Sequence, residues 1–169
     1  MVTAAASREP RAQQVVAALD QVMDPEMPGV SIVALGMVHA VEVDRDGVRI
    51  TLLPTFVGCP ALDVMRANAV SAVSHATGLE PDEIVVKYSS AVPWTSDRVA
   101  PSCHQALRSR GIAPPPRVTM DVMTDMPRVA CPWCGSPDTA PEGVFGPTAC
   151  RSIYYCRACR NPFEAMKPV

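Results

Sequence analysis

Apolar residues recur at helical spacing near the start of the chain and predict an amphipathic helix over residues 9–23. The stripe consists of Val15, Val16, Leu19, Val22 and Met23. Such spacing places all five on one face of a helix. The segment Asp24-Pro25-Glu26-Met27-Pro28-Gly29 ends the helix, because its two prolines remove backbone donors and disfavour helical backbone before them.

Two stretches of alternating apolar and polar residues follow, and they predict a β-hairpin. Residues 37–43 alternate around Val41 and Val43, and residues 48–52 alternate again. Arg45-Asp46-Gly47 lies between them. An Asp-Gly pair between two such runs is a strong hairpin signal.

The rest of the first 111 residues predicts two more helices and one more strand. A helical repeat runs from Ala61 to Val73 and is ended by Gly78. Residues 83–88 predict a third strand, and residues 101–110 predict a last helix that Gly111 ends. The order helix, strand, strand, helix, strand, helix indicates a small α+β domain.

The composition changes near residue 130 and divides the chain into two modules. Five of the seven cysteines and five of the eight aromatic residues lie after residue 130. Pro114-Pro115-Pro116 indicates a stiff, extended connector. We therefore expect an α+β domain at residues 1–111, a proline-rich linker at 112–128 and a cysteine-rich module at 129–169.

Charge and hydropathy narrow the range of partners. The chain has 169 residues, with 15 basic against 17 acidic side chains, so its net charge disfavours nucleic acid as a partner. No apolar run approaches the roughly 20 residues that span a bilayer. The first residues lack the charged and apolar regions of a signal peptide. We expect a cytoplasmic protein without membrane partners, whose odd number of cysteines stays reduced.

Four cysteines of the second module form two CxxC pairs separated by 21 residues: Cys131 with Cys134, and Cys156 with Cys159. Each pair can turn back so that two thiolates face one centre, and two pairs complete the tetrahedral site that Zn²⁺ prefers. A module of about 40 residues needs such a staple in order to fold. We expect a zinc ribbon with structural Zn²⁺, ahead of iron, and interpret Cys150 as a thiol outside the site, with a role as alternate ligand left open.

Cys59 lies between the hairpin and the second helix. Because Pro60 suits the first position of a helix, Cys59 is predicted to be the N-cap, where the helix dipole favours a thiolate. Thr55 is placed to donate a hydrogen bond to that thiolate. Asp24 and Glu26 flank Pro25 and are further candidates, with a solvated loop as the alternative. The local chemistry fits a reactive thiol and a small capping residue equally well.

Several of these segments resemble known families. Asp24-Pro25-Glu26, Ser31 to Val38 and Pro54 to Pro60 resemble the iron–sulfur-assembly domain of SufT-type proteins and of the cytosolic cluster-targeting factors of eukaryotes. Nearly the whole chain resembles the PaaD family, the small accessory subunits of the phenylacetyl-CoA ring epoxidase. The matching pieces there are Gly111 to Pro115, Cys131-Pro-x-Cys134-Gly-Ser, Phe145-Gly-x-Thr148-x-Cys150 and Cys156-x-x-Cys159-x-x-Pro162-Phe163.

The resemblance implies that residues 1–111 are an iron–sulfur-assembly-type domain of an accessory or maturation factor, with no turnover of substrate. It implies that Cys59 is the reactive thiol, beside Thr55, Asp24 and Glu26, and that a transient iron–sulfur cluster is one use of it. The implied partners are the oxygenase and [2Fe–2S] flavin reductase components of the epoxidase, together with the iron–sulfur assembly machinery. Two alternatives stay open: a thiol-dependent enzyme with Cys59 as nucleophile, which needs a positioned base, and a zinc-ribbon adaptor that binds proteins.

Overall fold

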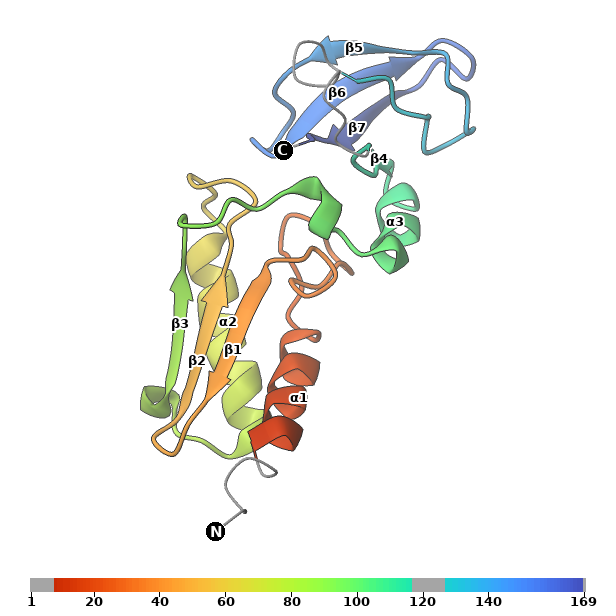
Figure 1. Cartoon of the computed structure of the whole chain (residues 1–169). Helices are drawn as coiled ribbons and strands as arrows, with labels where there is room; N and C mark the ends of the chain where they lie inside the picture. The colour runs from red at the N-terminus through yellow and green to blue at the C-terminus, as the bar shows by residue number, and fades with distance from the viewer. Residues whose placement is uncertain (1–7, 117–126, 169) are drawn as a thin grey trace. The chain divides into compact units, whose positions relative to one another are not determined.

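The computed structural model describes residues 8–116 and 127–168, and the chain forms two compact units that divide between Pro93 and Trp94 (Figure 1). We refer to them as the N-terminal unit and the C-terminal unit. The sequence pattern predicts the end of the first domain at residue 111, whereas the structure divides after Pro93. The third helix and the residues after it fold with the cysteine-rich segment, because the short strand that follows the helix pairs with the last strand of the chain.

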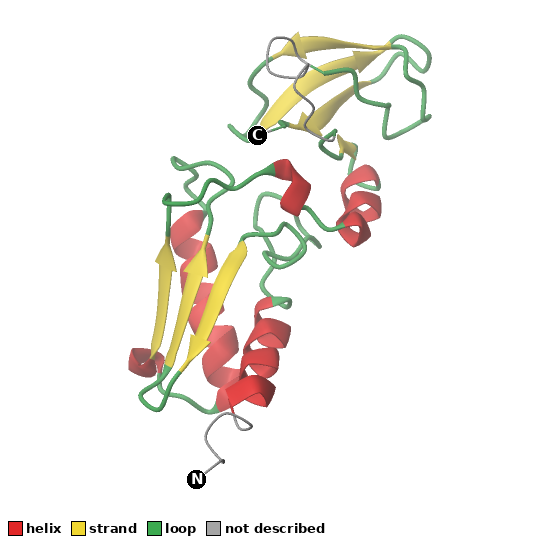
Figure 2. Cartoon of the chain, viewed as in Figure 1, coloured by secondary structure: helices red, strands yellow, loops and turns green. Residues whose placement is uncertain are grey.

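The N-terminal unit is a three-stranded sheet with two helices packed on one face (Figure 2). Its elements are α1 (Arg8–Leu19), β1 (Val38–Val43), β2 (Val48–Leu52), α2 (Leu62–Thr77), the 3₁₀ turn η1 (Pro81–Glu83) and β3 (Ile84–Tyr88). The strand order is β1-β2-β3, with β1 antiparallel and β3 parallel to β2. The predicted α+β class and the order of these elements are confirmed.

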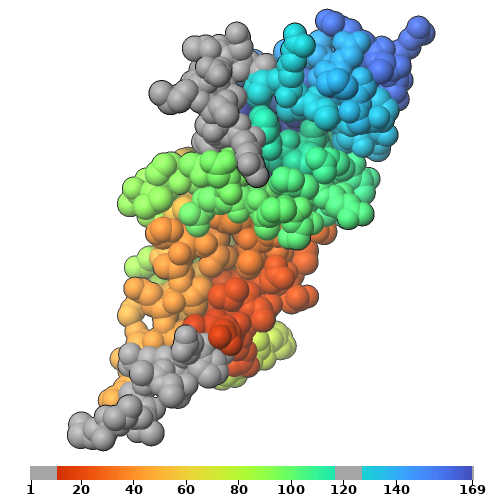
Figure 3. Space-filling view, turned by 45° about the vertical axis from the view of Figure 1, so that its right-hand side comes forward, coloured from red at the N-terminus to blue at the C-terminus, as the bar shows by residue number. Residues whose placement is uncertain are grey.

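The core of this unit lies between the sheet and the helices. Along β2 the side chains of Val48, Ile50 and Leu52 are buried while that of Arg49 is exposed, because successive residues of a strand point to opposite faces. The helices contribute the buried side chains of Val15, Leu19, Met65, Ala69 and Val73. In the space-filling view, the red atoms of α1 lie directly beside the orange segment that follows it (Figure 3).

The predicted hairpin turn is present, and its glycine has a second role. Asp44 donates its backbone N–H to the carbonyl of Gly47 at 3.0 Å, and Gly47 has φ +145°. A Cβ on Gly47 would collide with the carbonyl oxygen of Glu83, which directly precedes β3. Glycine therefore allows both the turn and the close approach of the segment that leads into β3.

The start of the second helix differs from the prediction. The N-cap of α2 is Ala61, and Cys59 lies two residues before it. The reason is a tight turn, in which Cys59 donates its N–H to the carbonyl of Phe56 at 3.2 Å and accepts the N–H of Leu62 at 3.3 Å. At the other end of α2, Gly78 has φ 71° and donates its N–H to Ser74, so the predicted glycine stop is confirmed.

The C-terminal unit is a four-stranded sheet preceded by one helix. Its elements are the 3₁₀ turn η2 (Ser96–Arg98), α3 (Pro101–Arg108), β4 (Ile112–Ala113), β5 (Thr139–Gly143), β6 (Arg151–Cys156) and β7 (Pro162–Met166). The strand order is β4-β7-β6-β5, with β4 parallel to β7 and the other pairs antiparallel. Buried between them are Ala113, Val129, Cys131, Tyr154, Cys156, Phe163 and Ala165.

The expected linker at residues 112–128 is partly a strand. Ile112 and Ala113 pair with Glu164 and Ala165 and are buried, since the edge of β7 offers free backbone groups that a strand satisfies. The part of the expected connector at residues 117–126 lies outside the described residues. Within the described ranges, every helix is too short or too polar to cross a membrane.

Candidate metal centre and thiol loop

The C-terminal unit brings four cysteine sulfurs together. Cys131 and Cys134 lie in the loop before β5, Cys156 ends β6, and Cys159 lies in the turn to β7. Their four Sγ atoms all lie within 4.8 Å of one another. The set is the one expected from the two CxxC pairs, and it is the only cluster of metal-binding side chains found among the described residues.

The distances within this cluster suit a tetrahedral metal. The Sγ atoms of Cys131 and Cys159 are 3.7 Å apart, and those of Cys134 and Cys156 are 3.6 Å apart. Zinc–sulfur bonds of about 2.3 Å place the ligands of a regular tetrahedron about 3.8 Å apart. None of the seven cysteines forms a disulfide. The residues present therefore fit Zn²⁺ with four thiolate ligands.

The two loops that carry the ligands close in the same way. Gly135 donates its N–H to the carbonyl of Cys131 at 2.9 Å, and Arg160 donates its N–H to the carbonyl of Cys156 at 2.9 Å. Both donors have left-handed backbone, with φ 74° at Gly135 and φ 59° at Arg160. Each CxxC pair is thus followed by one left-handed residue that turns the chain back. The CxxC spacing alone does not reveal that an arginine takes this conformation at the second loop.

The electrostatics of the cluster require a cation when all four sulfurs are ionised. Burial raises the pKa of Cys131 to about 12. Burial also raises the pKa of Cys159, but hydrogen bonds from Asn161 and from neighbouring thiols outweigh it and bring the pKa to about 7. Four thiolates at this separation repel one another. A bound dication offsets that repulsion, as structural zinc does in ribbons of this kind.

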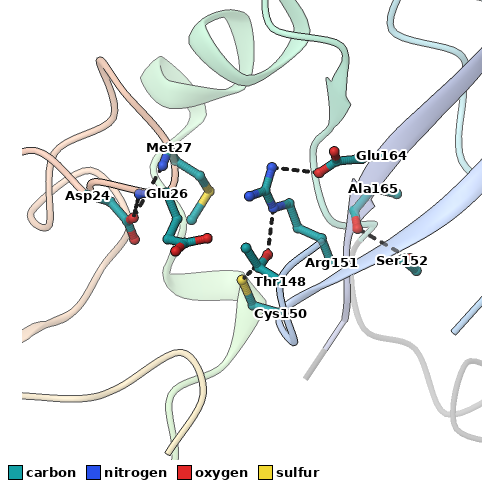
Figure 4. A network of polar contacts seen from close by, with 9 residues as sticks. All are labelled: Asp24, Glu26, Met27, Thr148, Cys150, Arg151, Ser152, Glu164 and Ala165. Carbon is teal, nitrogen blue, oxygen red and sulfur yellow. Dashed lines mark hydrogen bonds and ion pairs between the residues drawn. The ribbon is translucent and has the colours of Figure 1, made fainter. Parts of the chain in front are cut away.

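Cys150 lies outside the metal cluster and takes part in a separate polar network (Figure 4). Its Sγ is 3.3 Å from Thr148 Oγ1, which accepts a hydrogen bond of 2.7 Å from Arg151 Nε. Arg151 is buried, and its Nη1 lies 2.6 Å from Glu164 Oε2. This network joins the loop before β6 to β7 and accounts for Cys150 without a metal.

Cys59 lies in a loop with exposed apolar neighbours, which we call the thiol loop (residues 55–60). Cys59 itself is half-buried, whereas Phe56 and Val57 are 42% and 76% exposed. Thr55 lies four residues before Cys59 and is also half-buried. The hydrogen bond expected from Thr55 to the Cys59 sulfur stays a prediction.

Asp24 lies in the same unit and is 3% exposed. Its Oδ1 accepts the backbone N–H groups of Glu26 at 2.7 Å and Met27 at 3.2 Å, as Figure 4 shows. Such a pattern stabilises the turn that follows α1, so Asp24 has a structural role whatever else it does. Glu26 is half-buried beside it.

Tyr88 was not identified as a candidate from the sequence, yet the charges of Cys59 and Asp24 both act on it. Its hydroxyl donates a hydrogen bond of 2.9 Å to the carbonyl of Leu62, in the first turn of α2. Burial is the main reason that the pKa of Tyr88 rises to about 12, and the negative charges of Cys59 and Asp24 contribute to the rise. The structure therefore brings Cys59 and Asp24 into the electrostatic surroundings of one tyrosine. Only the pairing of β3 beside β2 places Tyr88 there.

The two units define a protein with an iron–sulfur-assembly-type domain and a zinc ribbon. Residues 12–86 match the family described as iron-sulfur cluster assembly protein, and residues 115–167 match the PaaD zinc beta ribbon domain. An Escherichia coli (strain K12) protein assigned to the 1,2-phenylacetyl-CoA epoxidase as one of its subunits is 35% identical over 158 residues, 94% of this chain and 93% of that protein. The chain belongs to the PaaD family.

Two further comparisons cover shorter stretches of this chain. The Fe-S protein maturation auxiliary factor YitW of Bacillus subtilis (strain 168) is 34% identical over 89 residues, which is 52% of this chain and 84% of that protein. A crystal structure of a domain of unknown function, DUF59, from Bacillus anthracis is 31% identical, with a TM-score of 0.56 over 61% of this chain and 96% of that one. Both agree with the predicted resemblance and with the α+β fold.

Proposed function

We propose that this protein is an accessory subunit of a phenylacetyl-CoA epoxidase and assists the assembly of iron–sulfur or iron centres in its partners. The observation that carries the proposal is the similarity along nearly the whole chain to an epoxidase subunit, combined with an N-terminal half that is similar to an Fe-S maturation factor. The proposed clients are the oxygenase and the [2Fe–2S] flavin reductase. The iron–sulfur assembly machinery supplies the cluster.

In this proposal Cys59 is the residue that contacts the cargo. Its sulfur is half-buried on a loop, and the neighbouring Phe56 and Val57 expose apolar side chains. In this proposal the two adjacent side chains form part of the surface that contacts the client. A client docked there would bring its own ligands up to the Cys59 thiolate, which then holds an iron–sulfur cluster during transfer.

The zinc ribbon is proposed to be structural. Zn²⁺ held by Cys131, Cys134, Cys156 and Cys159 has four protein ligands and no open position, which is the arrangement of structural sites. The metal supplies folding free energy to the C-terminal unit. The role of the zinc in the complex is then to hold the surface of the C-terminal unit in a single conformation.

The test is co-expression of the epoxidase components with wild-type protein, with Cys59→Ser and with Cys150→Ser. Cys150 is the matched control, because it is also half-buried and outside any disulfide. We expect the reductase from the Cys59→Ser strain to contain less [2Fe–2S] cluster, measured by its visible absorbance and iron content, and the control to be loaded fully. A fully loaded, active epoxidase from the Cys59→Ser strain would contradict a role for this thiol in maturation.

A further inference from the structure

We infer that Tyr88 is a positioning residue for Cys59: its hydroxyl fixes the first turn of α2, and that turn holds the thiol loop. The functional importance of Cys59 rests on the proposed function. The hydrogen bonds that link Tyr88 to Cys59 are independent of that proposal. Tyr88 is the last residue of β3, and its side chain reaches from the sheet to the start of α2.

The connection runs through one residue, Leu62. Tyr88 Oη donates to the carbonyl oxygen of Leu62 at 2.9 Å. The N–H of the same residue donates to the carbonyl of Cys59 at 3.3 Å. The Cys59 N–H in turn donates to the carbonyl of Phe56 at 3.2 Å. Three hydrogen bonds in sequence thus link the phenol to both sides of the Cys59 backbone.

The aromatic ring is held separately from the hydroxyl. The guanidinium of Arg66 lies over the ring, 5.7 Å from its centre, and also pairs with Asp63 at 2.6 Å. A cation at this distance from a ring face is attracted to it. Replacing Tyr88 with phenylalanine therefore removes the hydrogen bond to Leu62 and leaves the ring in place.

The hydroxyl of Tyr88 keeps its proton at neutral and mildly alkaline pH. Burial raises the pKa of Tyr88 to about 12; the Arg66 guanidinium opposes this rise, and the negative charges of Cys59, Asp63 and Asp24 add to it. The bond to Leu62 is consequently present whether Cys59 is a thiol or a thiolate. A neutral phenol also adds no negative charge beside a thiolate.

Sequence position alone would make Tyr88 an ordinary strand residue, so the test must separate positioning from general stability. The matched control is Ser74→Ala, which removes a hydrogen bond of 2.7 Å from Ser74 Oγ to the carbonyl of Leu79 at the other end of α2. Both variants lose one bond between a side chain and the backbone on the same helix. Only Tyr88→Phe loses it beside the thiol loop.

The measurement is the pH profile of alkylation at Cys59 by iodoacetamide, read by mass spectrometry on the purified full chain. We expect Tyr88→Phe to shift the midpoint of the profile by about half a pH unit, because the Leu62–Cys59 backbone that sets the surroundings of the sulfur is no longer held in one conformation. Hydrogen exchange at the amides of Leu62 and Met65 should become faster. Ser74→Ala should leave both unchanged.

Superimposable alkylation profiles for the two variants would overturn the inference. The assay uses no client protein, so it is independent of whether Cys59 matures an epoxidase. The proposed function fails if Cys59→Ser supports full cluster loading, whereas the role of Tyr88 fails if the Cys59 profile does not respond to loss of the hydroxyl.

Discussion

The indole of Trp133 occupies the space that a side chain on Gly111 would need. Atoms Cζ2 and Cη2 of the indole lie directly against the position of a Cβ at Gly111, and Gly111 has φ 75°. Trp133 belongs to the first CxxC loop, and Gly111 lies between α3 and β4. Two independent features therefore favour glycine at position 111: its left-handed backbone and the indole packed against it.

We expect Gly111→Ala to lower the free energy of unfolding of the C-terminal unit by about 2 to 4 kcal/mol, since it combines a left-handed conformation with overpacking. Gly135→Ala is the control, because Gly135 has φ 74° but no atom within 4 Å of the added Cβ. That variant should lose only about 1 kcal/mol. Urea unfolding followed by Trp fluorescence measures both. Equal losses would show that the indole moves away freely.

Loss of one metal ligand should unfold the ribbon. We expect wild-type protein to bind one zinc per chain and Cys134→Ser to bind none. Zinc bound by four thiolates supplies on the order of 10 kcal/mol of folding free energy, and three thiolates do not hold the metal tightly enough to supply it. Cys150→Ser should bind zinc normally, since its sulfur contacts Thr148 and lies outside the cluster. Elemental analysis and circular dichroism measure the outcome. Full zinc content in Cys134→Ser would refute the four-ligand assignment.

The N-terminal unit should survive the loss of zinc. Its core consists of its own sheet and helices, and none of the four clustered cysteines belongs to it. We expect hydrogen exchange in α2 and β2 to be unchanged after chelation of the metal, while β5, β6 and β7 lose protection. Loss of protection in both units together would indicate that they fold as one.

Stability should fall in alkali because of Cys103. This side chain in α3 is 3% exposed, and burial raises the pKa of its thiol to about 11. The folded state thus favours the protonated thiol, and unfolding releases a proton once the pH exceeds the ordinary thiol pKa of 9.0. The stabilisation that the protonated Cys103 gives to the folded state is complete below about pH 9 and is lost as the pH rises toward 11, and it amounts to at most about 3 kcal/mol.

The variant Cys103→Ala should reduce this dependence. Denaturant unfolding of the zinc-loaded protein at pH 7.5 and pH 10 gives the comparison, and the difference between the two values should be smaller in the variant than in the wild type. An identical difference would mean that other groups cause the alkaline loss.

Asp24 offers a separate test of a structural role. Asp24→Ala removes an acceptor from two backbone N–H groups in a buried turn, so we expect a loss of about 2 kcal/mol in unfolding free energy. Asp44→Ala is the control: it removes the acceptor of the Asp46 N–H in an exposed turn, together with the surface ion pair between Asp44 and Arg49. That change should cost less than about 1 kcal/mol. Similar losses at the two positions would argue against burial as the cause.

The sequence was most informative where one local pattern decides the structure. Alternation predicted β2 and the hairpin, and spacing predicted that the sulfurs of Cys131, Cys134, Cys156 and Cys159 come together. The prediction that Cys59 is the N-cap of α2 was wrong. Pro60 suits the first position of a helix, but the chain forms another turn before the helix begins after Ala61. Local patterns favour both choices, and only the hydrogen bonds around Leu62 decide between them.

Relationships between distant residues were not accessible from the sequence. The pairing of Ile112 with β7 depends on a free strand edge more than 50 residues later in the chain. The local sequence does not reveal this pairing, and the three consecutive prolines that follow predicted a linker instead. Tyr88 and the start of α2 are 26 residues apart, and no local spacing rule connects them. These contacts come from tertiary packing.

The pairing of β4 with β7 determines where the two modules can be exchanged between proteins. The segment recognised as the ribbon begins at residue 115, after the strand that completes its sheet. A ribbon transplanted from residue 115 would leave one edge of β7 without its partner and Trp133 without the backbone of Gly111. Grafting should therefore use the junction at Pro93 and Trp94, and recombination at that junction would carry α3 along with the metal site.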